Sequence, residues 1–146
     1  MSDIVSLLGK ELVDGKKQKI STSSVVESSK VIGLYFSAHW CPPCRMFTPM
    51  LKTFYNTYKS SEKLEIIFIS SDQDVTQWQE YFSEMPWIAL PYEDRAMKEK
   101  LSKTFDVRGI PTLIFLDAET GDIISLNGRE VVHKHQPGQA FPWNEK

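Results

Sequence analysis

Cysteine is the residue type whose placement in this chain most directly indicates chemistry. The chain has two cysteines, Cys41 and Cys44, and only two residues separate them. They follow residues 31–37, a run rich in β-branched and aromatic side chains that predicts a buried strand, and we expect a helix from Cys41 onward. A cysteine at a helix N-terminus lies beside unpaired N–H groups and the positive end of the helix dipole, both of which stabilise a thiolate. Because the thiolate is the reactive form of sulfur, this placement predicts thiol–disulfide exchange.

Three other uses of a cysteine pair fit this sequence less well. A structural zinc site usually needs four nitrogen or sulfur ligands. Only His39, His133 and His135 remain to supply them, and the last two lack the spacing usual for zinc-binding histidines. A structural disulfide across so short a loop would add little stability, and an inert pair would not require a strand–turn–helix setting. We therefore favour the redox interpretation and expect no metal site.

Length and composition favour one globular domain over residues 1–146, with 41% hydrophobic and 12% aromatic residues to build its core. A net charge of -2 argues against a nucleic-acid binder. No apolar run reaches the ~18 residues of a membrane span. Residues 1–10 lack the basic region and long apolar core of a signal peptide. We therefore expect the chain in the cytoplasm or the nucleus, where thiols are kept reduced and such a pair is more often catalytic than structural.

Strands and helices alternate along the first half of the chain, and a hairpin follows. The expected strands are 4–13, 31–37, 64–70, 112–116 and 123–126, with a short extended piece at 87–90. The expected helices are 41–59, one carrying Trp78, Tyr81 and Phe82 that starts after Asp74, and 94–104, with one helical turn within 21–29. This order predicts an α/β fold with a central mixed β-sheet and helices on both faces.

These elements and the position of the cysteine pair resemble the thioredoxin superfamily over nearly the whole chain. The matching motifs are Phe36, Ala38, Trp40-Cys41, Pro43-Cys44, the helix-kinking Pro49, and Ile110-Pro111-Thr112, the loop whose proline is cis in that family. The resemblance implies the thioredoxin fold and a thiol–disulfide oxidoreductase that needs no bound cofactor.

Further motifs are similar to those of the nucleoredoxin and tryparedoxin branch. They are Trp40-Cys41-Pro42-Pro43-Cys44-Arg45, Phe47-Thr48-Pro49, the run from Tyr81 to Trp87, Leu90-Pro91-Tyr92 and Phe141-Pro142-Trp143. Tryparedoxins carry Trp-Asp-Glu after the central strand, whereas this chain has Ser71-Asp72-Gln73. The closer resemblance is therefore to a small, nucleoredoxin-like thioredoxin domain.

The resemblance and the position of each cysteine imply the roles of the site residues. Cys41 is nearer the preceding loop and is expected to be the nucleophile, while Cys44, one turn into the helix, is expected to resolve the mixed disulfide. The residues expected to contact the substrate are Trp40, Pro42, Pro43, Ile110 and Pro111. An extended client segment would pair with the backbone of Ile110 as an added strand.

The predicted function is that of a monomeric protein-disulfide oxidoreductase in cellular redox regulation. Its partners would be disulfide-containing client proteins and an upstream reductase or dithiol donor. The alternative is a redox-sensing binding module of the nucleoredoxin type, which docks signalling proteins in one redox state.

Two features of the sequence leave questions for the structure. Thioredoxins carry a buried aspartate where this chain has Tyr35, and a tyrosine is a poor base at neutral pH, so the general base stays unassigned. The C-terminal tail, 131–146, begins with Val131 and Val132 and continues in a polar stretch that we expect to be mobile over 133–138. We expect Phe141 and Trp143 to dock on the domain, because large aromatic side chains gain free energy by leaving water.

Overall fold

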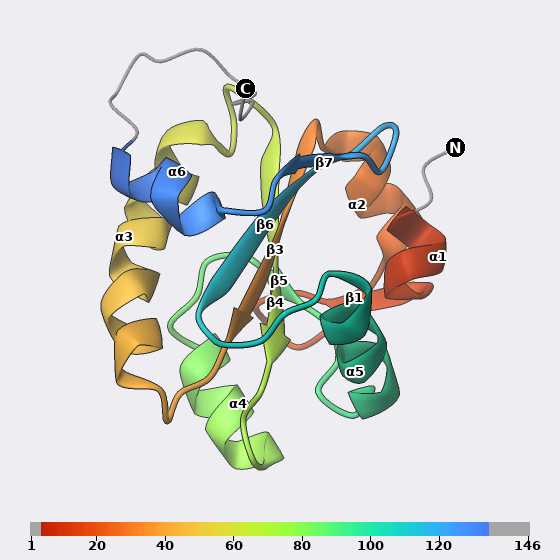
Figure 1. The fold of residues 1–146 in the computed structure, drawn as a ribbon. Coiled ribbons are helices and arrows are strands. Elements are labelled where there is room, and N and C mark those ends of the chain that lie inside the picture. The colour runs from red at the N-terminus through yellow and green to blue at the C-terminus, as the bar shows by residue number, and fades with distance from the viewer. Residues whose placement is uncertain (1–3, 135–146) are drawn as a thin grey trace.

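The computed structural model describes residues 4–134, and its centre is a seven-stranded mixed sheet in the order β2-β1-β5-β4-β3-β6-β7 (Figure 1). The strands are β1 (Glu11–Val13), β2 (Lys19–Ser21), β3 (Val31–Ser37), β4 (Leu64–Ser70), β5 (Ile88–Ala89), β6 (Thr112–Asp117) and β7 (Ile123–Ser125). The helices are α1 (Ile4–Leu8), α2 (Thr22–Ser28), α3 (Pro42–Tyr58), α4 (Val75–Phe82), α5 (Arg95–Thr104) and α6 (Gly128–Lys134). The predicted α/β fold with a mixed sheet is confirmed.

The middle of the sheet is formed by β3, which pairs in parallel with β4 and antiparallel with β6. All seven residues of β3 are buried, as expected for a strand that is covered on both faces. Because β3 and β4 run in the same direction, Ser37 and Ser70 pair at their carboxyl ends. The loops that follow these two strands therefore start side by side at one edge of the sheet.

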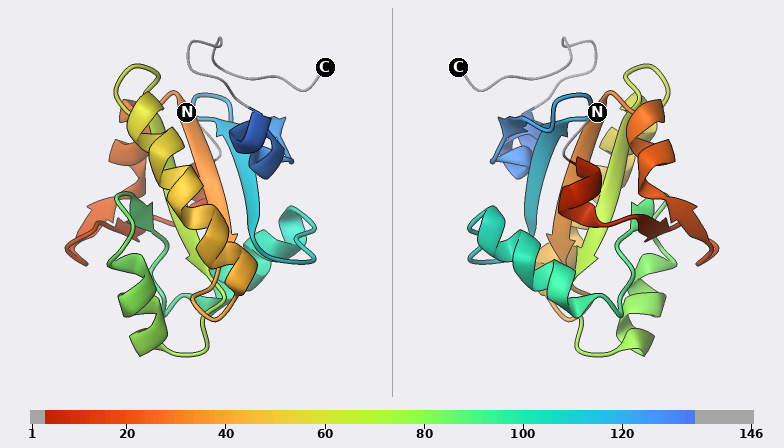
Figure 2. Two further views of the ribbon diagram at one scale, coloured as in Figure 1. Left: turned by 90° about the vertical axis from the view of Figure 1, so that its left-hand side faces the viewer. Right: turned by 90° about the vertical axis from the view of Figure 1, so that its right-hand side faces the viewer.

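Helices cover both faces of the sheet, with α3 in front in one view of Figure 2 and α1 and α5 in front in the other. Side chains of β3 alternate between two cores, as the pleat of a strand requires. Tyr35 joins the core formed with α3, α4 and α6, to which Phe47 and Trp78 belong. Leu34 joins the core formed with α1, α2 and α5, to which Leu101 belongs.

The prediction of a strand over 4–13 is wrong for its first half. Residues Ile4–Leu8 form α1, and only Glu11–Val13 are a strand. Ile4 and Leu8 lie four positions apart and are both fully buried, so the helical period places both apolar side chains on one face. Gly9 follows with a φ of +87°, a left-handed conformation that glycine adopts readily at the end of a helix.

The chain after β7 also differs from the expectation. Residues 131–134 belong to α6, and the His133 ring lies 5.9 Å from the ring of Phe47, so the predicted mobile stretch does not begin at His133. The predicted docking of Phe141 and Trp143 lies outside the described residues. Within residues 4–134, no helix combines the length and the apolar character that crossing a membrane requires.

Candidate active site

The two cysteines lie where β3 gives way to α3. Cys41 is the N-cap residue of α3, and its Sγ accepts a hydrogen bond from the Cys44 N–H at 3.4 Å. Pro42 and Pro43 occupy the first helical turn, where a missing N–H leaves no helical bond unmade. The helix N-terminus therefore directs a backbone donor at the sulfur of Cys41, which favours negative charge on that atom.

Both cysteines are free thiols and both are buried, although Cys41 is 5% exposed and Cys44 is 0% exposed. Burial is the largest influence on Cys44, and together with the hydrogen bond to Cys41 it raises the pKa of this thiol to about 11. Cys44 is therefore protonated at neutral pH in the reduced protein. The Ser37 side chain and the Ala38 backbone act in the opposite direction and lower its pKa.

The loop before β6 brings a second segment to the cysteines. The Ile110-Pro111 bond is cis, as the resemblance implied. The thiol of Cys41 points at the Ile110 carbonyl oxygen across 3.9 Å, and Ile110 packs against the small buried cluster of Ala38, Cys41 and Cys44. The structure thus assembles the cysteine pair and this loop at one place, as predicted.

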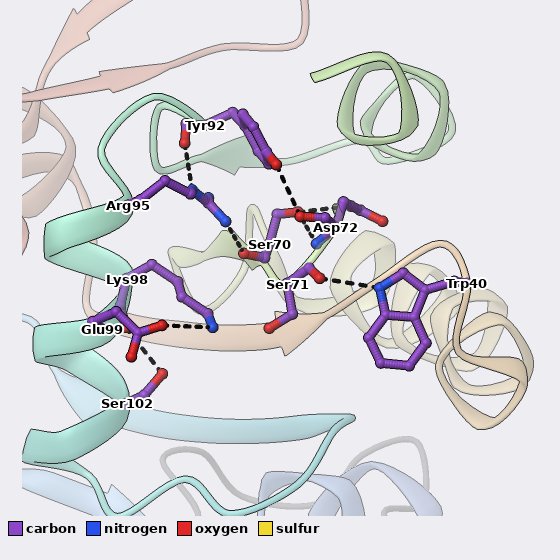
Figure 3. Close-up of polar contacts among 9 residues, drawn as sticks. All are labelled: Trp40, Ser70, Ser71, Asp72, Tyr92, Arg95, Lys98, Glu99 and Ser102. Carbon is purple, nitrogen blue, oxygen red and sulfur yellow. Dashed lines mark hydrogen bonds and ion pairs between the residues drawn. The ribbon is translucent and has the colours of Figure 1, made fainter. Parts of the chain in front are cut away.

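Trp40 is the large apolar side chain that this site exposes. It is 50% exposed, and its indole N–H donates to the Ser71 carbonyl oxygen at 3.0 Å (Figure 3). Pro42 and Pro43 are exposed beside it, whereas Pro111 is buried. Trp40, Pro42 and Pro43 therefore form an exposed edge beside the buried sulfur pair.

A buried carboxylate holds the loop that carries Trp40, and the sequence prediction missed it. Asp72 is 4% exposed, and its side chain accepts hydrogen bonds from the His39 N–H at 2.7 Å and the Ser70 hydroxyl at 2.6 Å. The Tyr92 hydroxyl donates to the Asp72 carbonyl oxygen at 2.9 Å. In the sequence, Asp72 stood out only because its neighbours depart from the tryparedoxin signature.

Arg95 supports the same loop from α5 (Figure 3). Its Nη1 donates to the Ser70 carbonyl oxygen at 2.8 Å and its Nε donates to the Tyr92 carbonyl oxygen at 2.6 Å. Its guanidinium carbon lies 4.0 Å from the centre of the Tyr92 ring. Burial lowers the pKa of Arg95, and the charge of Asp72 opposes that shift. The hydrogen bonds of Arg95 thus tie the end of β4 to the start of α5.

The position of the usual aspartate is taken by a group of buried hydroxyls. The Tyr35 hydroxyl lies 2.7 Å from Thr48 Oγ1, which lies 2.7 Å from the Tyr81 hydroxyl, which in turn lies 2.8 Å from Ser37 Oγ. Burial raises the pKa of Tyr35 and of Tyr81, so both are neutral at physiological pH. Sequence reasoning missed this group, because its members come from three elements and nothing in their spacing relates them.

Side chains that could bind a metal ion are dispersed in the part of the chain that the structure describes. Within residues 4–134, histidine, cysteine and carboxylate side chains nowhere gather in a group of three or more that could hold a metal ion. His39, the histidine nearest the cysteines in the sequence, instead stacks on the Tyr81 ring at 5.5 Å.

The fold and a dithiol beside a cis-proline loop are those of the thioredoxin class of proteins. The chain belongs to the thioredoxin-like family, whose sequence model matches residues 29–123. That match includes the cysteine pair and the cis-proline loop.

Relatives and solved structures agree with this assignment. The chain is 43% identical to zebrafish (Danio rerio) nucleoredoxin over 98% of its own length, which is 35% of the nucleoredoxin. It is 43% identical to a tryparedoxin of Trypanosoma brucei brucei over 88% of each chain. The solved tryparedoxin from Trypanosoma brucei superposes with a TM-score of 0.90 at 39% identity, covering 99% of this chain and 100% of that one. A tryparedoxin II in complex with glutathionylspermidine gives 0.91 at 36% identity, with coverage of 99% and 100%.

Proposed function

We propose that this chain reduces disulfide bonds of client proteins through Cys41 and Cys44 in cellular redox regulation, in the cytoplasm or the nucleus. The observation that carries the proposal is the placement of Cys41. Its sulfur accepts the Cys44 N–H at 3.4 Å at the start of α3 and faces the Ile110 carbonyl at 3.9 Å. A helix N-terminus favours the thiolate, and an adjacent cis-proline loop offers backbone to an extended client.

The reaction has two exchange steps. The Cys41 thiolate attacks one sulfur of the client disulfide, so that a mixed disulfide forms and the other client sulfur leaves with the electron pair. Cys44 then attacks the Cys41 sulfur, which forms the Cys41–Cys44 disulfide and releases the second client thiol. A raised pKa for Cys44 keeps it protonated during the first step, so Cys41 is the sulfur that competes for the client.

The edge around the pair supplies the client contacts. An extended client segment would pair with the Ile110 backbone, and the half-exposed Trp40, next to Cys41 in the chain, would contact the same client. Pro42 and Pro43 carry no N–H, so they present a rigid, donor-free surface to the client. An upstream reductase or a small dithiol would return the pair to the reduced state by the same exchange in reverse.

The experiment is reduction of insulin disulfides with a thiol donor present, comparing the wild-type chain with two single variants. Cys41→Ser should abolish turnover, and Cys44→Ser should accumulate a covalent mixed disulfide that non-reducing electrophoresis detects. Turnover that persists in Cys41→Ser would refute the assignment of the nucleophile. Equal melting temperatures of the three reduced proteins would exclude a folding defect as the cause.

A second candidate function rests on the exposed indole. Trp40 is 50% exposed directly beside a pair whose oxidation would alter its surroundings, which suits a module that docks signalling proteins in one redox state. Capture of a candidate partner by the reduced and the oxidised chain separates the two functions. Slow turnover with a large redox-dependent change in affinity supports the module, whereas fast turnover with equal capture supports the enzyme.

A further inference from the structure

The indole of Trp40 is held by a backbone carbonyl that belongs to another loop. Its N–H donates to the Ser71 carbonyl oxygen at 3.0 Å, and the Ser71 N–H in turn donates to the Ser37 carbonyl oxygen at 2.9 Å (Figure 3). This inference rests on the proposed function, in which the half-exposed Trp40 contacts the client beside Cys41. The groups that hold Ser71 therefore determine where the indole is presented to the client.

The residues on either side of Ser71 are held by two side chains at the start of α5. On one side, the Ser70 carbonyl oxygen accepts a hydrogen bond from Arg95 Nη1 at 2.8 Å. On the other side, the Asp72 carbonyl oxygen accepts a hydrogen bond from the Tyr92 hydroxyl at 2.9 Å. Because peptide units are planar, the Ser71 carbonyl cannot turn away from the indole without disturbing one of these neighbours.

Arg95 fixes Tyr92 as well as Ser70. Its Nε donates to the Tyr92 carbonyl oxygen at 2.6 Å, and its guanidinium carbon lies 4.0 Å from the centre of the Tyr92 ring. A planar guanidinium can donate from two nitrogens in fixed directions and stack on an aromatic face at the same time. One side chain thus fastens Ser70 directly and orients the ring whose hydroxyl reaches Asp72.

The placement of Arg95 is unfavourable in one respect. Within residues 4–134 its Nη2 atom is buried and has no hydrogen-bond partner, although Nε and Nη1 are both bonded. An unpaired buried donor lowers stability, and apolar side chains can fasten a loop without that loss. The geometry that Arg95 imposes on two loops therefore explains its presence better than a gain in stability does.

We propose that Arg95 is a positioning residue for client recognition, which holds the Trp40 indole beside the cysteine pair. It acts through the backbone of Ser70 and the ring of Tyr92, and it needs no contact with the client. Cys41 is placed separately, by the start of α3. The substrates that depend on Arg95 are therefore disulfides within protein segments long enough to reach the indole, whereas a small disulfide can react at Cys41 without it.

The first experiment measures hydrogen exchange of the Trp40 indole N–H by NMR, with its signal identified by its absence in Trp40→Phe. The bond to the Ser71 carbonyl protects this proton, so a variant that releases the carbonyl should speed the exchange. Arg95→Met keeps most of the side-chain volume and removes the donors. We expect it to raise the exchange rate about fivefold, the size of one hydrogen bond between neutral groups.

Two further variants test which part of the arrangement matters. Tyr92→Phe keeps the ring and removes the hydroxyl that reaches Asp72, so it should also speed the exchange, and it makes the same test if Arg95→Met does not fold. Arg95→Lys keeps the charge but replaces the two-nitrogen fork by one ammonium, so it should restore only part of the protection. Wild-type exchange in Arg95→Lys would overturn the role of the fork.

The matched control is Lys100→Ala, because Lys100 is an exposed cation on the same helix. It should leave the exchange of the Trp40 indole N–H unchanged. Equal exchange rates in Arg95→Met and Lys100→Ala would overturn the proposal.

The second experiment compares insulin with DTNB, a small aromatic disulfide, as substrates of the same variants. Arg95→Met should lower the ratio of kcat/KM for insulin to the rate constant for DTNB several-fold, since only the protein reaches the indole. The ratio for Lys100→Ala should equal that of the wild type. In a Trp40→Ala background, Arg95→Met should have no further effect on the ratio.

The outcomes separate positioning from a structural role. An equal effect of Arg95→Met with and without Trp40 would overturn the proposal, and so would a lowered melting temperature with an unchanged ratio. Failure of the wild-type chain to reduce insulin would refute the proposed function, whereas exchange of the indole N–H would still show whether Arg95 positions Trp40.

Discussion

The sulfur of Cys41 lies 3.9 Å from the carbonyl oxygen of Ile110, although 69 positions separate the two residues in the sequence. The contact joins the start of α3 to the loop before β6. It is possible because β3 and β6 are neighbours in the sheet, with Phe36 paired to Thr112 at the end that carries both loops. A client segment that pairs with the Ile110 backbone would therefore arrive within reach of the reactive sulfur.

Trp40 should contribute more to the reduction of protein disulfides than to the reduction of small-molecule disulfides. Its side chain is 50% exposed beside the pair, so Trp40→Ala removes contact area that only an extended client can use. We expect the KM for insulin to rise several-fold and the rate with DTNB to change little.

The matched control for Trp40 is Ile123→Ala. Ile123 is 51% exposed on β7, and its truncation removes a similarly exposed apolar side chain away from the cysteines. Equal KM values for insulin in Trp40→Ala and Ile123→Ala would argue against client contact by Trp40.

Stability should fall with rising pH because of Cys44. Burial and the hydrogen bond with Cys41 raise the pKa of this thiol from 9.0 to about 11, so the unfolded chain releases the proton at a lower pH than the folded chain. Between those values the folded state binds more protons, and linkage makes stability decrease as the pH rises. The contribution of Cys44 to the free energy of unfolding is fully present below pH 9 and is lost by pH 11. The free energy of unfolding should therefore fall by on the order of 2 kcal/mol across this range.

Urea unfolding of the reduced chain at several pH values measures this loss. Buried tyrosines such as Tyr35 and Tyr81 also have raised pKa values and destabilise the fold in the same direction at high pH. Cys44→Ser retains those tyrosines, so the difference between the two proteins isolates the thiol. Parallel stability profiles for the wild type and Cys44→Ser would contradict the prediction.

The features predicted correctly from the sequence are those encoded by local patterns. The strands 31–37 and 64–70 match β3 and β4 residue for residue, since a strand buried on both faces is a continuous apolar run bounded by polar residues. The cysteine pair and the cis-proline loop were found because each is a short motif. Residues 4–8 were misassigned, because so short an apolar segment fits a strand as well as a helix.

The features that sequence reasoning missed depend on long-range packing. The group of buried hydroxyls combines Ser37 on β3, Thr48 on α3 and Tyr81 on α4, and no spacing in the sequence relates these three. Thr48 and Tyr81 were read only as motif positions and as core. Asp72 keeps the aspartate of the tryparedoxin signature while its neighbours depart from it, and its burial against the Trp40 loop follows from the parallel pairing of β3 and β4.

Gly128 should tolerate no side chain at the start of α6. A Cβ there would lie 2.6 Å from both the Cγ and the carbonyl oxygen of Leu113, which is buried in β6 and cannot easily move away. We expect Gly128→Ala to lower the free energy of unfolding by about 1–3 kcal/mol, the usual cost of overpacking. Gly15→Ala is the control, because a Cβ at Gly15 has nothing within 4 Å. Equal urea midpoints for the two variants would show that α6 can shift to make room.

Asp72 should hold the Trp40 loop through its acceptor oxygens more than through its charge. Asp72→Ala removes the acceptor of the His39 N–H, at 2.7 Å, and of the Ser70 hydroxyl, at 2.6 Å. Donors left without partners in a partly buried site cost about 1–3 kcal/mol, so we expect a loss of stability of that size. We also expect greater mobility of Trp40, which its fluorescence anisotropy would report.

Asp72→Asn separates the contribution of the acceptor oxygens of Asp72 from that of its negative charge. Its amide oxygen can still accept the His39 N–H, so Asp72→Asn should retain most of the ordering of Trp40. It should lose the attraction between the carboxylate and Arg95, which opposes the lowering of the Arg95 pKa by burial. Asp122→Ala, at an exposed turn residue, controls for the removal of one negative charge. If Asp72→Asn freed Trp40 as fully as Asp72→Ala does, the charge pairing with Arg95 would be what orders the loop. If Asp72→Ala matched Asp122→Ala in stability and anisotropy, Asp72 would have no part in positioning Trp40.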